Sequence, residues 1–425
     1  MDHWERGAAE PWPRRRELLQ YPPTCEEMSR RYFAGGREAE VPPLRTVAAP
    51  NAFKGTLDAL DAAEAICAGV RDADASARAT AVPMADGGDG TAAVLGAALG
   101  AVWRTAHVPG PWGDQREAAF ALLPDGTAVV DIAAASGLGR LRPGPREAVT
   151  ASTLGTGMLV AAALGAGARR VWLALGGSAT SDGGTGILRA LGARFLDPAG
   201  RDLPLGAAAL AHLARVDLTT LVRPRDGVTA LVDVRNPLLG SDGSAAVFGP
   251  QKGADRNAVL ALENGLARFA DVLEATTGCR VRDVPGAGAA GGAGFGLAAA
   301  MGACIRSGAE VVAEAVGLRG RLAACDLCFT GEGRLDGQTA LGKAPAAVGA
   351  LAAGAGVPAV ALCGDLGPGW EGLLSPRGPF AAILPLAPGP RTRAEALAAT
   401  AADLRRTAAA AVRLFTAANR LLPGS

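Results

Sequence analysis

Three lysines, each next to a glycine, are the first residues in this chain whose type suggests a chemistry. They stand at Lys54, Lys252 and Lys343, among 42 basic residues that are otherwise all arginine. Because the sequence favours arginine so strongly, a retained lysine marks a position where a compact ammonium with three donors does something that a planar guanidinium cannot. Lysine beside glycine places a point charge and bare backbone N–H groups on a phosphate. The alternative is that these three lysines were retained by chance. The pattern favours a phosphate site.

Two carboxylates three residues apart, Asp86 and Asp89, lie in a glycine-rich segment after a predicted strand. Hard oxygen ligands of this kind suit Mg²⁺, which keeps most of its waters and bridges to phosphates. The alternative is that aspartate forms the turn and caps the following helix, which fits Asp89 better than it fits both residues together.

The densest polar segment runs over 176–184 and contains Ser178, Thr180 and Asp182. Hydroxyls and bare amides can bind a small polyhydroxy acid, and Asp182 could accept a proton from an attacking hydroxyl. A further polar segment, 330–336, follows another predicted strand. There Arg334 could bind a carboxylate with two parallel hydrogen bonds, and a surface ion pair with a neighbouring acid is the alternative.

Two generic fingerprints carry less information. Gly286, Gly288 and Gly291 match G-x-G-x-x-G, but they lie in a run dominated by alanine and glycine and no ribose-binding acid follows at the expected place. This run is better interpreted as a closely packed helix entry with N–H groups available to an anion. The segment 337–343 matches a Walker A loop until Ala344, which replaces the Ser or Thr that should hold Mg²⁺.

The overall composition excludes several classes of protein. A length of 425 residues allows two or three domains, and a net charge of +1 gives no electrostatic case for nucleic acid or an anionic membrane. The uncharged stretches 284–305 and 344–364 consist mainly of alanine and glycine, so we expect no membrane span in them. Seven cysteines form no framework. We interpret Cys325 and Cys328 as core thiols, and we expect a soluble protein of the reducing cytoplasm.

From Arg45 onwards the chain alternates strand, glycine turn and helix, which predicts an α/β fold with a mostly parallel sheet covered by helices. Ligands of such folds lie at the carboxyl ends of the strands, where every glycine-rich motif falls. We predict strands at 45–49, 79–83, 102–107, 118–122, 128–132, 170–175, 229–234, 325–330, 358–363 and 381–386. We predict helices at 57–70, 152–165, 185–191, 255–276, 346–353 and 393–421.

Residues 1–44 differ from the rest in their proline, tryptophan and charge, and no apolar stretch follows their three consecutive arginines. We therefore predict no secretory or twin-arginine signal here. A flexible extension, a segment that binds a partner and a misplaced start codon all remain open.

Taken together, the motifs resemble the type I glycerate kinase family. The matching segments occur in the order of the family, and they cover the chain from Arg45 to about Gly364. They are APNAFKGTLDA (49–59), VPMADGGDGT (82–91), ASTLGTG (151–157), LGGSATSDGGTGILRALGARF (175–195), DVRNPLLG (233–240), VFGPQKGAD (247–255), PGAGAAGGAGFG (285–296) and CFTGEGRLDGQTALGKAP (328–345).

The resemblance implies ATP-dependent phosphorylation of D-glycerate, usually to 2-phosphoglycerate, in glyoxylate, glycerate or sugar-acid metabolism. It implies two unlike α/β domains with the active site in the cleft between them. The first is Rossmann-like, three-layered and built from 45–90 and 290–425, and the second comprises 91–289. A homodimer is compatible with the sequence, which leaves the oligomeric state open.

The expected site residues follow from these motifs. Lys54 is expected to act in catalysis together with Asp182 as proton acceptor and Arg334 at the substrate carboxylate, with Asp336 and Asp233 in reserve as base or metal ligand. Mg²⁺ is expected at Asp86 and Asp89. Phosphate or ATP contacts are expected from Lys252, Lys343, Gly288, Gly291, Gly292, Gly331 and Glu332. Substrate contacts are expected from Ser178, Thr180, Asp233 and Asn236.

The departures from the family pattern are few. Asn51 stands where Ser or Asp is usual, Asp89 stands where Glu is common, and residues 1–44 have no counterpart. Three alternatives remain. One is a kinase for another small hydroxy acid such as tartronate or erythronate. The second is a catalytically silent regulator that binds glycerate or nucleotide, and the third is a nicotinamide-dependent oxidoreductase.

Overall fold

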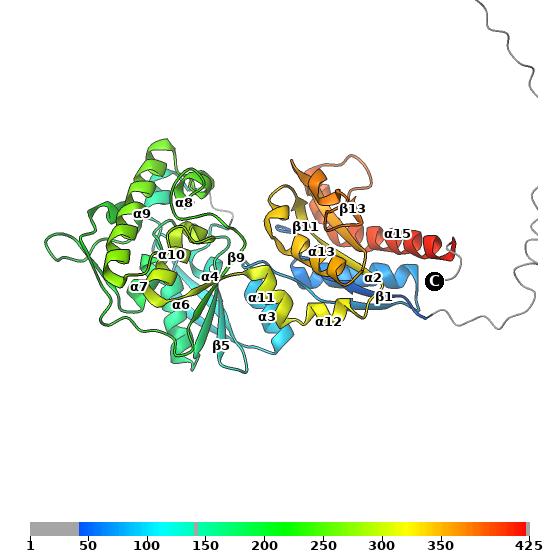
Figure 1. The fold of residues 1–425 in the computed structure, drawn as a ribbon, viewed down its shortest axis with the longest axis horizontal. Helices are drawn as coiled ribbons and strands as arrows, with labels where there is room; N and C mark the ends of the chain where they lie inside the picture. Colours follow the sequence, from blue (N-terminus) through cyan, green and yellow to red (C-terminus); the bar gives the residue numbers. More distant parts are fainter. Residues whose placement is uncertain (1–41, 140–142, 422–425) are drawn as a thin grey trace, which may run out of the picture. The chain divides into compact units, whose positions relative to one another are not determined.

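The structure is a computed structural model that describes residues 42–139 and 143–421. Residues 1–41 of the predicted extension 1–44 therefore lie outside the described residues. Residues from Leu44 onwards belong to one compact unit, and their strands form two large sheets and one small one (Figure 1). The mixed α/β architecture with mostly parallel strands confirms the predicted fold class.

The first sheet takes strands from both ends of the chain, in the order β13-β12-β11-β1-β2, and all its pairings are parallel. Successive strand residues point to opposite faces. Ala48 and Phe329 therefore pack against helices α2 and α15, whereas Val47 and Cys328 pack on the other face with Val348 of α13. The strands are β1 (Arg45–Ala48), β2 (Arg78–Ala81), β11 (Leu327–Leu335), β12 (Ala359–Leu366) and β13 (Ala382–Pro385), and the helices are α2 (Ala59–Ala73), α13 (Ala344–Gly354) and α15 (Thr400–Leu421).

The second sheet has the order β10-β9-β6-β5-β4-β3, in which β4 runs antiparallel to both of its neighbours, β3 and β5, and all other pairings are parallel. Its strands are β3 (Val102–Pro109), β4 (Gln115–Leu122), β5 (Thr127–Asp131), β6 (Arg170–Ala174), β9 (Val228–Val232) and β10 (Cys304–Ser307). A small antiparallel pair joins β7 (Arg194–Leu196) to β8 (Arg215–Asp217).

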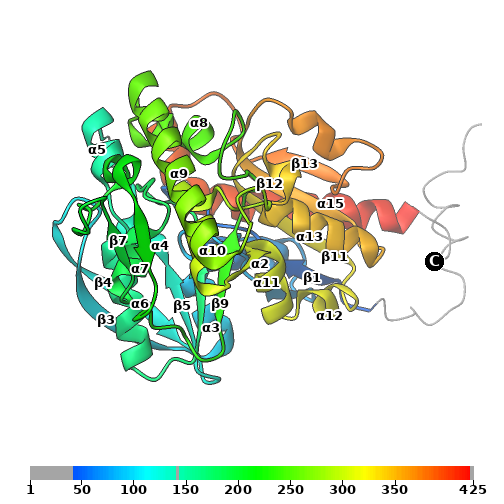
Figure 2. The ribbon, with the colours of Figure 1, turned by 60° about the vertical axis from the view of Figure 1, so that its left-hand side comes forward.

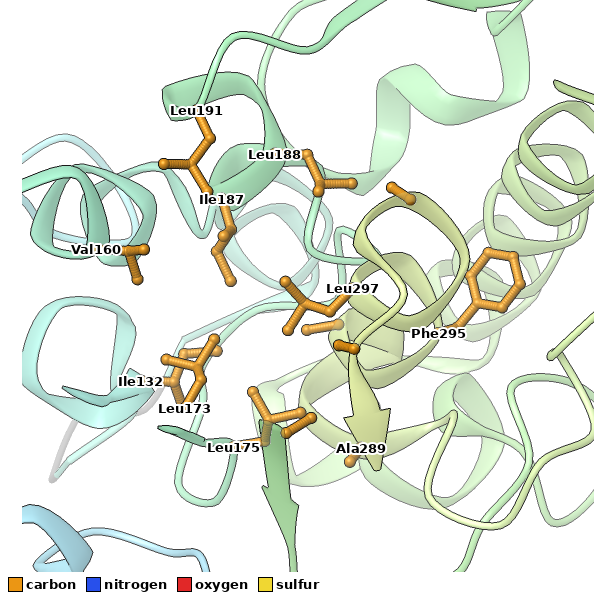
Figure 3. Close-up of a cluster of buried hydrophobic side chains, with 14 of the residues drawn as sticks. Ile132, Val160, Leu173, Leu175, Ile187, Leu188, Leu191, Ala289, Phe295 and Leu297 are labelled. Atoms are coloured by element: carbon orange, nitrogen blue, oxygen red, sulfur yellow. The ribbon is translucent and has the colours of Figure 1, made fainter. Parts of the chain in front are cut away.

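Helices cover both faces of the second sheet. On one face Leu297 of α10 (Ala289–Met301) lies among Ile187 of α7 (Thr185–Ala190) and the β6-end residues Leu173 and Leu175 (Figure 3). Helices α8 (Ser244–Phe248), α9 (Arg256–Thr277) and α10 pack against one another (Figure 2). On the other face, α3 (Thr91–Leu99) and α11 (Gly308–Ala315) share one hydrophobic cluster with the first sheet. The core is therefore continuous between the two sheets.

Shorter elements complete the described part of the chain. They are α4 (Ile132–Ser136), α5 (Pro145–Thr150), α6 (Leu154–Gly165), α12 (Leu318–Leu322), α14 (Arg393–Ala398) and four 3₁₀ turns at Ala207–His212, Pro250–Lys252, Thr339–Leu341 and Trp370–Leu374. Each predicted strand has a counterpart whose ends differ by a few residues, and β11 extends the predicted strand 325–330 to Leu335. The predicted helices also have counterparts, except that the single helix expected at 393–421 is divided at Ala399 into α14 and α15.

Strand β10 was not predicted, because four residues after a long run of alanine and glycine give no clear period. It joins the second sheet at 304–307, beyond residue 289 where the sequence places the end of the second domain. The strands of the second sheet thus extend further along the chain than expected. The division into domains stays a prediction.

The structure also bears on the predictions for the cysteines and for membrane spans. Cys325 and Cys328 are buried free thiols, which confirms their interpretation as core residues, and burial raises the pKa of Cys325 to about 11. Among the described residues one helical stretch, Pro145–Gly165, is long and apolar enough to cross a membrane, and 56% of its apolar window is buried in the protein. Such burial is typical of a core helix, and the two stretches flagged from the sequence form shorter helices.

Candidate active site

The carboxyl ends of three neighbouring strands bring the first set of polar residues together. Strand β1 leads to Asn51 and Lys54, β2 leads to Asp86, and β11 contains Gly331 and Glu332. The backbone N–H of Asn51 donates to the carbonyl of Gly331 at 2.8 Å. Because β1 lies between β2 and β11, these side chains share one edge of the first sheet.

The loop 86–90 also contacts the carboxyl ends of the second sheet. Gly176, after β6, donates its N–H to the carbonyl of Gly87 at 2.8 Å. A Cβ on Gly87 would lie 2.8 Å from the carbonyl of Leu231 in β9, and Gly87 has a φ of +93°, so only glycine fits there. A Cβ on Gly308, at the start of α11, would collide with the carbonyl of Asp86. The loop therefore lies against the edges of both sheets.

Asp86 is buried, with 5% of its surface exposed, and has a fixed orientation. Its Oδ2 accepts a hydrogen bond from Nδ2 of Asn51 at 2.9 Å. The side chain of Asn51 is fixed in turn, because its Oδ1 accepts from the N–H of Ala52 at 2.8 Å. One oxygen of Asp86 thus has a protein donor. Asn51 was not among the site residues expected from the sequence, although it lies in the same motif as Lys54.

Asp86, Lys54 and Lys343 all act on the charge of two further carboxyl groups, Asp233 and Glu332. Burial, reinforced by the charge of Asp86, raises the pKa of the Asp233 carboxyl to about 6, while Lys54 and Lys343 oppose the rise. Burial raises the pKa of Glu332 to about 7, and Lys343 and a hydrogen bond from Thr339 Oγ1 at 2.9 Å oppose that rise. We call Lys54, Asp86, Asp233, Glu332 and Lys343 the Asp86 cluster.

The donor set of the Asp86 cluster fits Mg²⁺ better than a metal held wholly by protein. Among residues 42–139 and 143–421, no group of three His, Cys, Asp or Glu side chains is placed to hold a metal ion. Mg²⁺ needs only one or two carboxylates when waters and phosphates complete its shell, and Asp86 and Glu332 supply two. Asp89, the second ligand expected from the sequence, is exposed, and its charge acts on the buried carboxyl of Asp131.

A second polar group surrounds Lys252, which is only 3% exposed. Its Nζ donates to Ser178 Oγ at 3.1 Å and to the carbonyl of Thr180 at 2.6 Å. Burial lowers the pKa of Lys252 to about 8, and the charge of Asp182 opposes this. The expected lysine and the expected substrate hydroxyls are thus brought together, and the ammonium is already bonded to the segment 176–184. The Oγ1 of Thr180 is buried and has no hydrogen-bond partner in the described part of the chain.

Asp182 is fully buried and surrounded by protein donors. Its oxygens accept from the N–H and Oγ1 of Thr153 and from the N–H groups of Gly184 and Gly186, at 2.9–3.2 Å. Burial raises the pKa of Asp182, and these donors oppose the rise. Such a carboxylate organises the start of α7, and its geometry does not support the proton-accepting role expected from the sequence.

The glycine-rich run before α10 serves close packing. Ala290, Gly291 and Gly292 have φ values of 52°, 68° and 84°, so three consecutive residues are left-handed. Gly291 accepts a hydrogen bond from the N–H of Gly183 at 2.9 Å, and a Cβ on it would collide with the carbonyl of Thr180. The packing of this run on 180–183 agrees with a helix entry, and the phosphate contacts expected of Gly288, Gly291 and Gly292 stay a prediction.

Three expected site residues lie in more open surroundings. Arg334 is exposed, and its Nε lies 4.0 Å from Asp336 and 3.8 Å from Asp365, which is the surface ion pairing left open as the alternative. Asn236 donates to the carbonyl of Asp242 at 2.8 Å. The roles expected of Arg334, Asp336 and Asn236 stay predictions.

Asp131 is a buried carboxylate that sequence reasoning missed. It ends strand β5 and accepts hydrogen bonds from the N–H groups of Gly90 and Ala92, both at 3.0 Å. Burial raises its pKa to about 7, and the two N–H groups oppose the rise. Its place at the end of a predicted strand was the available signal.

Comparison with known proteins supplies the family. The model of the glycerate kinase family matches residues 46–416. A glycerate 2-kinase of Escherichia coli (strain K12) is 40% identical over 326 residues, which cover 76% of this chain and 86% of that protein. A glycerate kinase of Bacillus subtilis (strain 168) is 41% identical over 326 residues, 76% of this chain and 85% of that protein.

A solved structure agrees with these relatives. The crystal structure of a "putative glycerate kinase 2" from Salmonella typhimurium LT2 aligns with a TM-score of 0.76 and 35% sequence identity. The alignment covers 89% of this chain and 100% of that one, so the likeness extends over both sheets.

Proposed function

Since this chain belongs to the glycerate kinase family and is a kinase, we propose that it transfers the γ-phosphoryl group of ATP to the C2 hydroxyl of D-glycerate. The Asp86 cluster carries this proposal. Phosphoryl transfer requires positive charge around the phosphates, an in-line approach and an acceptor for the hydroxyl proton. The cluster offers two lysines and three carboxylates, with Lys343 at the start of α13 and the other four residues in or after the carboxyl-end parts of strands from both sheets.

Lys54 and Lys343 are the residues that we propose for the phosphates of ATP. Lys54 is exposed on a loop after β1, and Lys343 precedes α13 and is half-buried. Both lie close enough to Asp233 and Glu332 to oppose the rise that burial causes in the pKa of each carboxyl. Two ammonium groups on this edge neutralise the charge that gathers on the γ-phosphoryl oxygens in the transition state.

Asp86 and Glu332 are the proposed ligands of Mg²⁺. An Mg²⁺ ion held by these two carboxylates would offset negative charge on the phosphates of the nucleotide. Asn51 holds one oxygen of Asp86 at 2.9 Å, and Thr339 holds one oxygen of Glu332 at 2.9 Å, so each carboxylate has a fixed direction. This pair replaces Asp89, whose side chain is exposed, as the second ligand.

Asp233 is the proposed proton acceptor, in place of Asp182. The oxygen of the glycerate C2 hydroxyl attacks the γ-phosphorus while the bond from that phosphorus to the β,γ-bridging oxygen breaks. ADP leaves with the bonding electrons, and the hydroxyl proton passes to the carboxylate of Asp233. Asp233 directly follows β9 of the second sheet and is half-buried, and a pKa of about 6 leaves it ionised at neutral pH.

The second sheet is where we propose that glycerate binds. Ser178 lies after β6 with its hydroxyl held by Lys252, and Thr180 has a hydroxyl free of protein partners within the described residues. Arg334 remains the proposed partner of the substrate carboxylate. A cytoplasmic location is part of the same proposal, and the buried free thiols of Cys67, Cys328 and Cys363 are compatible with a reducing compartment.

The experiment uses purified protein with ATP, Mg²⁺ and D-glycerate, and locates the phosphate of the product by phosphorus NMR. We expect ADP formation that requires both glycerate and Mg²⁺, with phosphate on C2. Phosphate on C3 would contradict the proposed position, and faster turnover of tartronate or erythronate would contradict the proposed substrate. Binding of glycerate or ATP without any turnover would favour the regulator.

A further inference from the structure

The side chain of Asp131 accepts hydrogen bonds from a segment that is distant in the sequence, and not from the helix that Asp131 precedes. It occupies the N-cap position of α4, where aspartate commonly accepts from an N–H of its own helix, yet its side chain makes no such bond. Its Oδ2 accepts from Gly90 and its Oδ1 from Ala92, 41 and 39 residues earlier in the chain. With 8% of its surface exposed, the carboxylate is committed to these two donors.

The two donors form the amino terminus of α3. Gly90 is the N-cap of this nine-residue helix and has no side chain to cap it, so its first N–H groups depend on an outside acceptor. The amino terminus of a helix attracts anions, which is why a glycine-rich loop before a helix often binds phosphate. Here the carboxylate of Asp131 already fills that place. The loop 86–90 is therefore better suited to present a carboxylate than to bind a phosphate.

The same loop has several backbone contacts with the second sheet. Gly87 accepts from Gly176 and lies against Leu231, and Asp86 lies against Gly308. These contacts define the path of the loop near its start, at Asp86 and Gly87. Asp131 holds the other end, at Gly90 and Ala92, with a charged side chain.

We propose that Asp131 is a positioning residue for Asp86, and that its hydrogen bonds to the start of α3 fix the loop so that Asp86 stands beside Asn51. The inference rests on the proposed function, in which Asp86 holds the metal ion. Asp131 does not touch the substrate in this account. It acts through the backbone of the loop, and a loop displaced by about 1 Å can reduce turnover about 100-fold.

Asp131→Asn tests the proposal with a nearly unchanged side-chain volume, because it turns one of the two acceptors into a donor that faces an N–H group. We expect kcat to fall about 10- to 100-fold with little change in the KM for D-glycerate. We also expect faster amide hydrogen exchange in a peptide that covers 82–92. An unchanged kcat in a folded variant would overturn the proposal and leave Asp131 as a helix cap only.

Thr392→Ala is the matched control. Thr392 caps α14 by accepting from the N–H of Glu395, and it has no place in the proposed site. It should lower the melting temperature without changing kcat, when both variants are assayed below their melting temperatures.

Hydrogen exchange of the wild-type protein tests the contact without any variant. The amides of Gly90 and Ala92 are expected to exchange slowly, and rapid exchange would overturn the proposal even if Asp131→Asn failed to fold. Wild-type protein without glycerate-dependent turnover would instead contradict the proposed function, while the exchange data would still report on the loop. The two failures are therefore distinguishable.

Discussion

Asn51 and Asp86, which follow neighbouring parallel strands, are joined by a buried hydrogen bond of 2.9 Å from the amide Nδ2 to the carboxylate Oδ2. Asn51 can only donate through this nitrogen, so Asp86 is the acceptor and its Oδ2 is held in a fixed direction. The bond holds one oxygen of the Asp86 carboxylate and so fixes the orientation of this side chain within the Asp86 cluster. This relationship is the structural basis of the predictions that follow.

Replacing Asn51 should disturb the site through Asp86. Asn51→Leu removes the donor to Asp86 with a similar side-chain volume, so we expect kcat to fall at least about 10-fold, with a weaker response to Mg²⁺. Asn51→Ser keeps a donor and should lose less. The measurement is kcat as a function of Mg²⁺ concentration for both variants. Equal kinetics of the two variants would contradict a role for the hydrogen-bond donor beside Asp86.

Substitutions of Asp233 and Asp182 should have different effects, the first on kcat and the second on the free energy of unfolding. Asp233→Asn removes the proposed proton acceptor, so kcat should fall about 100-fold or more while the melting temperature stays close to that of the wild type. Asp182→Asn leaves several buried N–H groups poorly paired and should mainly lower the free energy of unfolding, by about 1–3 kcal/mol. Kinetics and thermal unfolding of both variants decide the matter, and the reverse pattern would restore Asp182 as the proton acceptor.

The pH dependence of kcat/KM should report Asp233. A proton acceptor must be ionised, and burial together with Asp86 raises the pKa of Asp233 to about 6. We therefore expect kcat/KM to rise as the pH increases through about 6 and to level off above it. The profile is measured between pH 5 and 8 with saturating Mg²⁺. A profile that is flat across this range, or that falls as the pH rises through 6, would contradict the assignment.

Gly87 and Gly90 form a matched pair for the loop. Both have a φ of +93°, so alanine at either position costs about 1–2 kcal/mol in backbone strain. A Cβ at Gly90 meets no atom within 4 Å, whereas one at Gly87 lies 2.8 Å from the backbone of Leu231. We expect Gly87→Ala to lower the free energy of unfolding by about 1–3 kcal/mol more than Gly90→Ala does. Equal losses in denaturant unfolding would show that the contact with β9 is not tight.

Lys343 and Lys252 should respond differently to the same substitution. Lys343→Met removes a positive charge that we propose binds the phosphates of ATP. This variant should raise the KM for ATP and lower kcat. Lys252→Met replaces a buried ammonium, the pKa of which is lowered to about 8 by burial. It also removes the hydrogen bonds to Ser178 and Thr180. Its main effects should be on the KM for glycerate and on stability. Steady-state kinetics with each substrate varied in turn provide the test.

The sequence predicted the strands and helices well because their signals are local. Apolar runs ending in glycine turns located β1, β2, β6, β9 and β11, and the polar motifs at their ends indicated the edge where Asp86, Lys54 and Glu332 meet. The likeness to the family supplied the chemistry.

Burial and long-range contacts were beyond the reach of the sequence. A carboxylate in a glycine-rich segment can face a substrate or bind the amides of the next helical turn, and only the fold shows that Asp182 does the latter. Asp131 could not be identified as a partner of Gly90, because their contact depends on how β5 meets a loop 41 residues earlier in the chain.

The most direct test of the account compares ATP turnover by the wild type and by Asp86→Asn, each with and without D-glycerate and Mg²⁺. The account predicts glycerate-dependent ADP formation by the wild type, and a loss of about 100-fold or more in kcat for Asp86→Asn with its fold intact by circular dichroism. Retention of wild-type turnover by Asp86→Asn would show that the Asp86 cluster is not the catalytic centre.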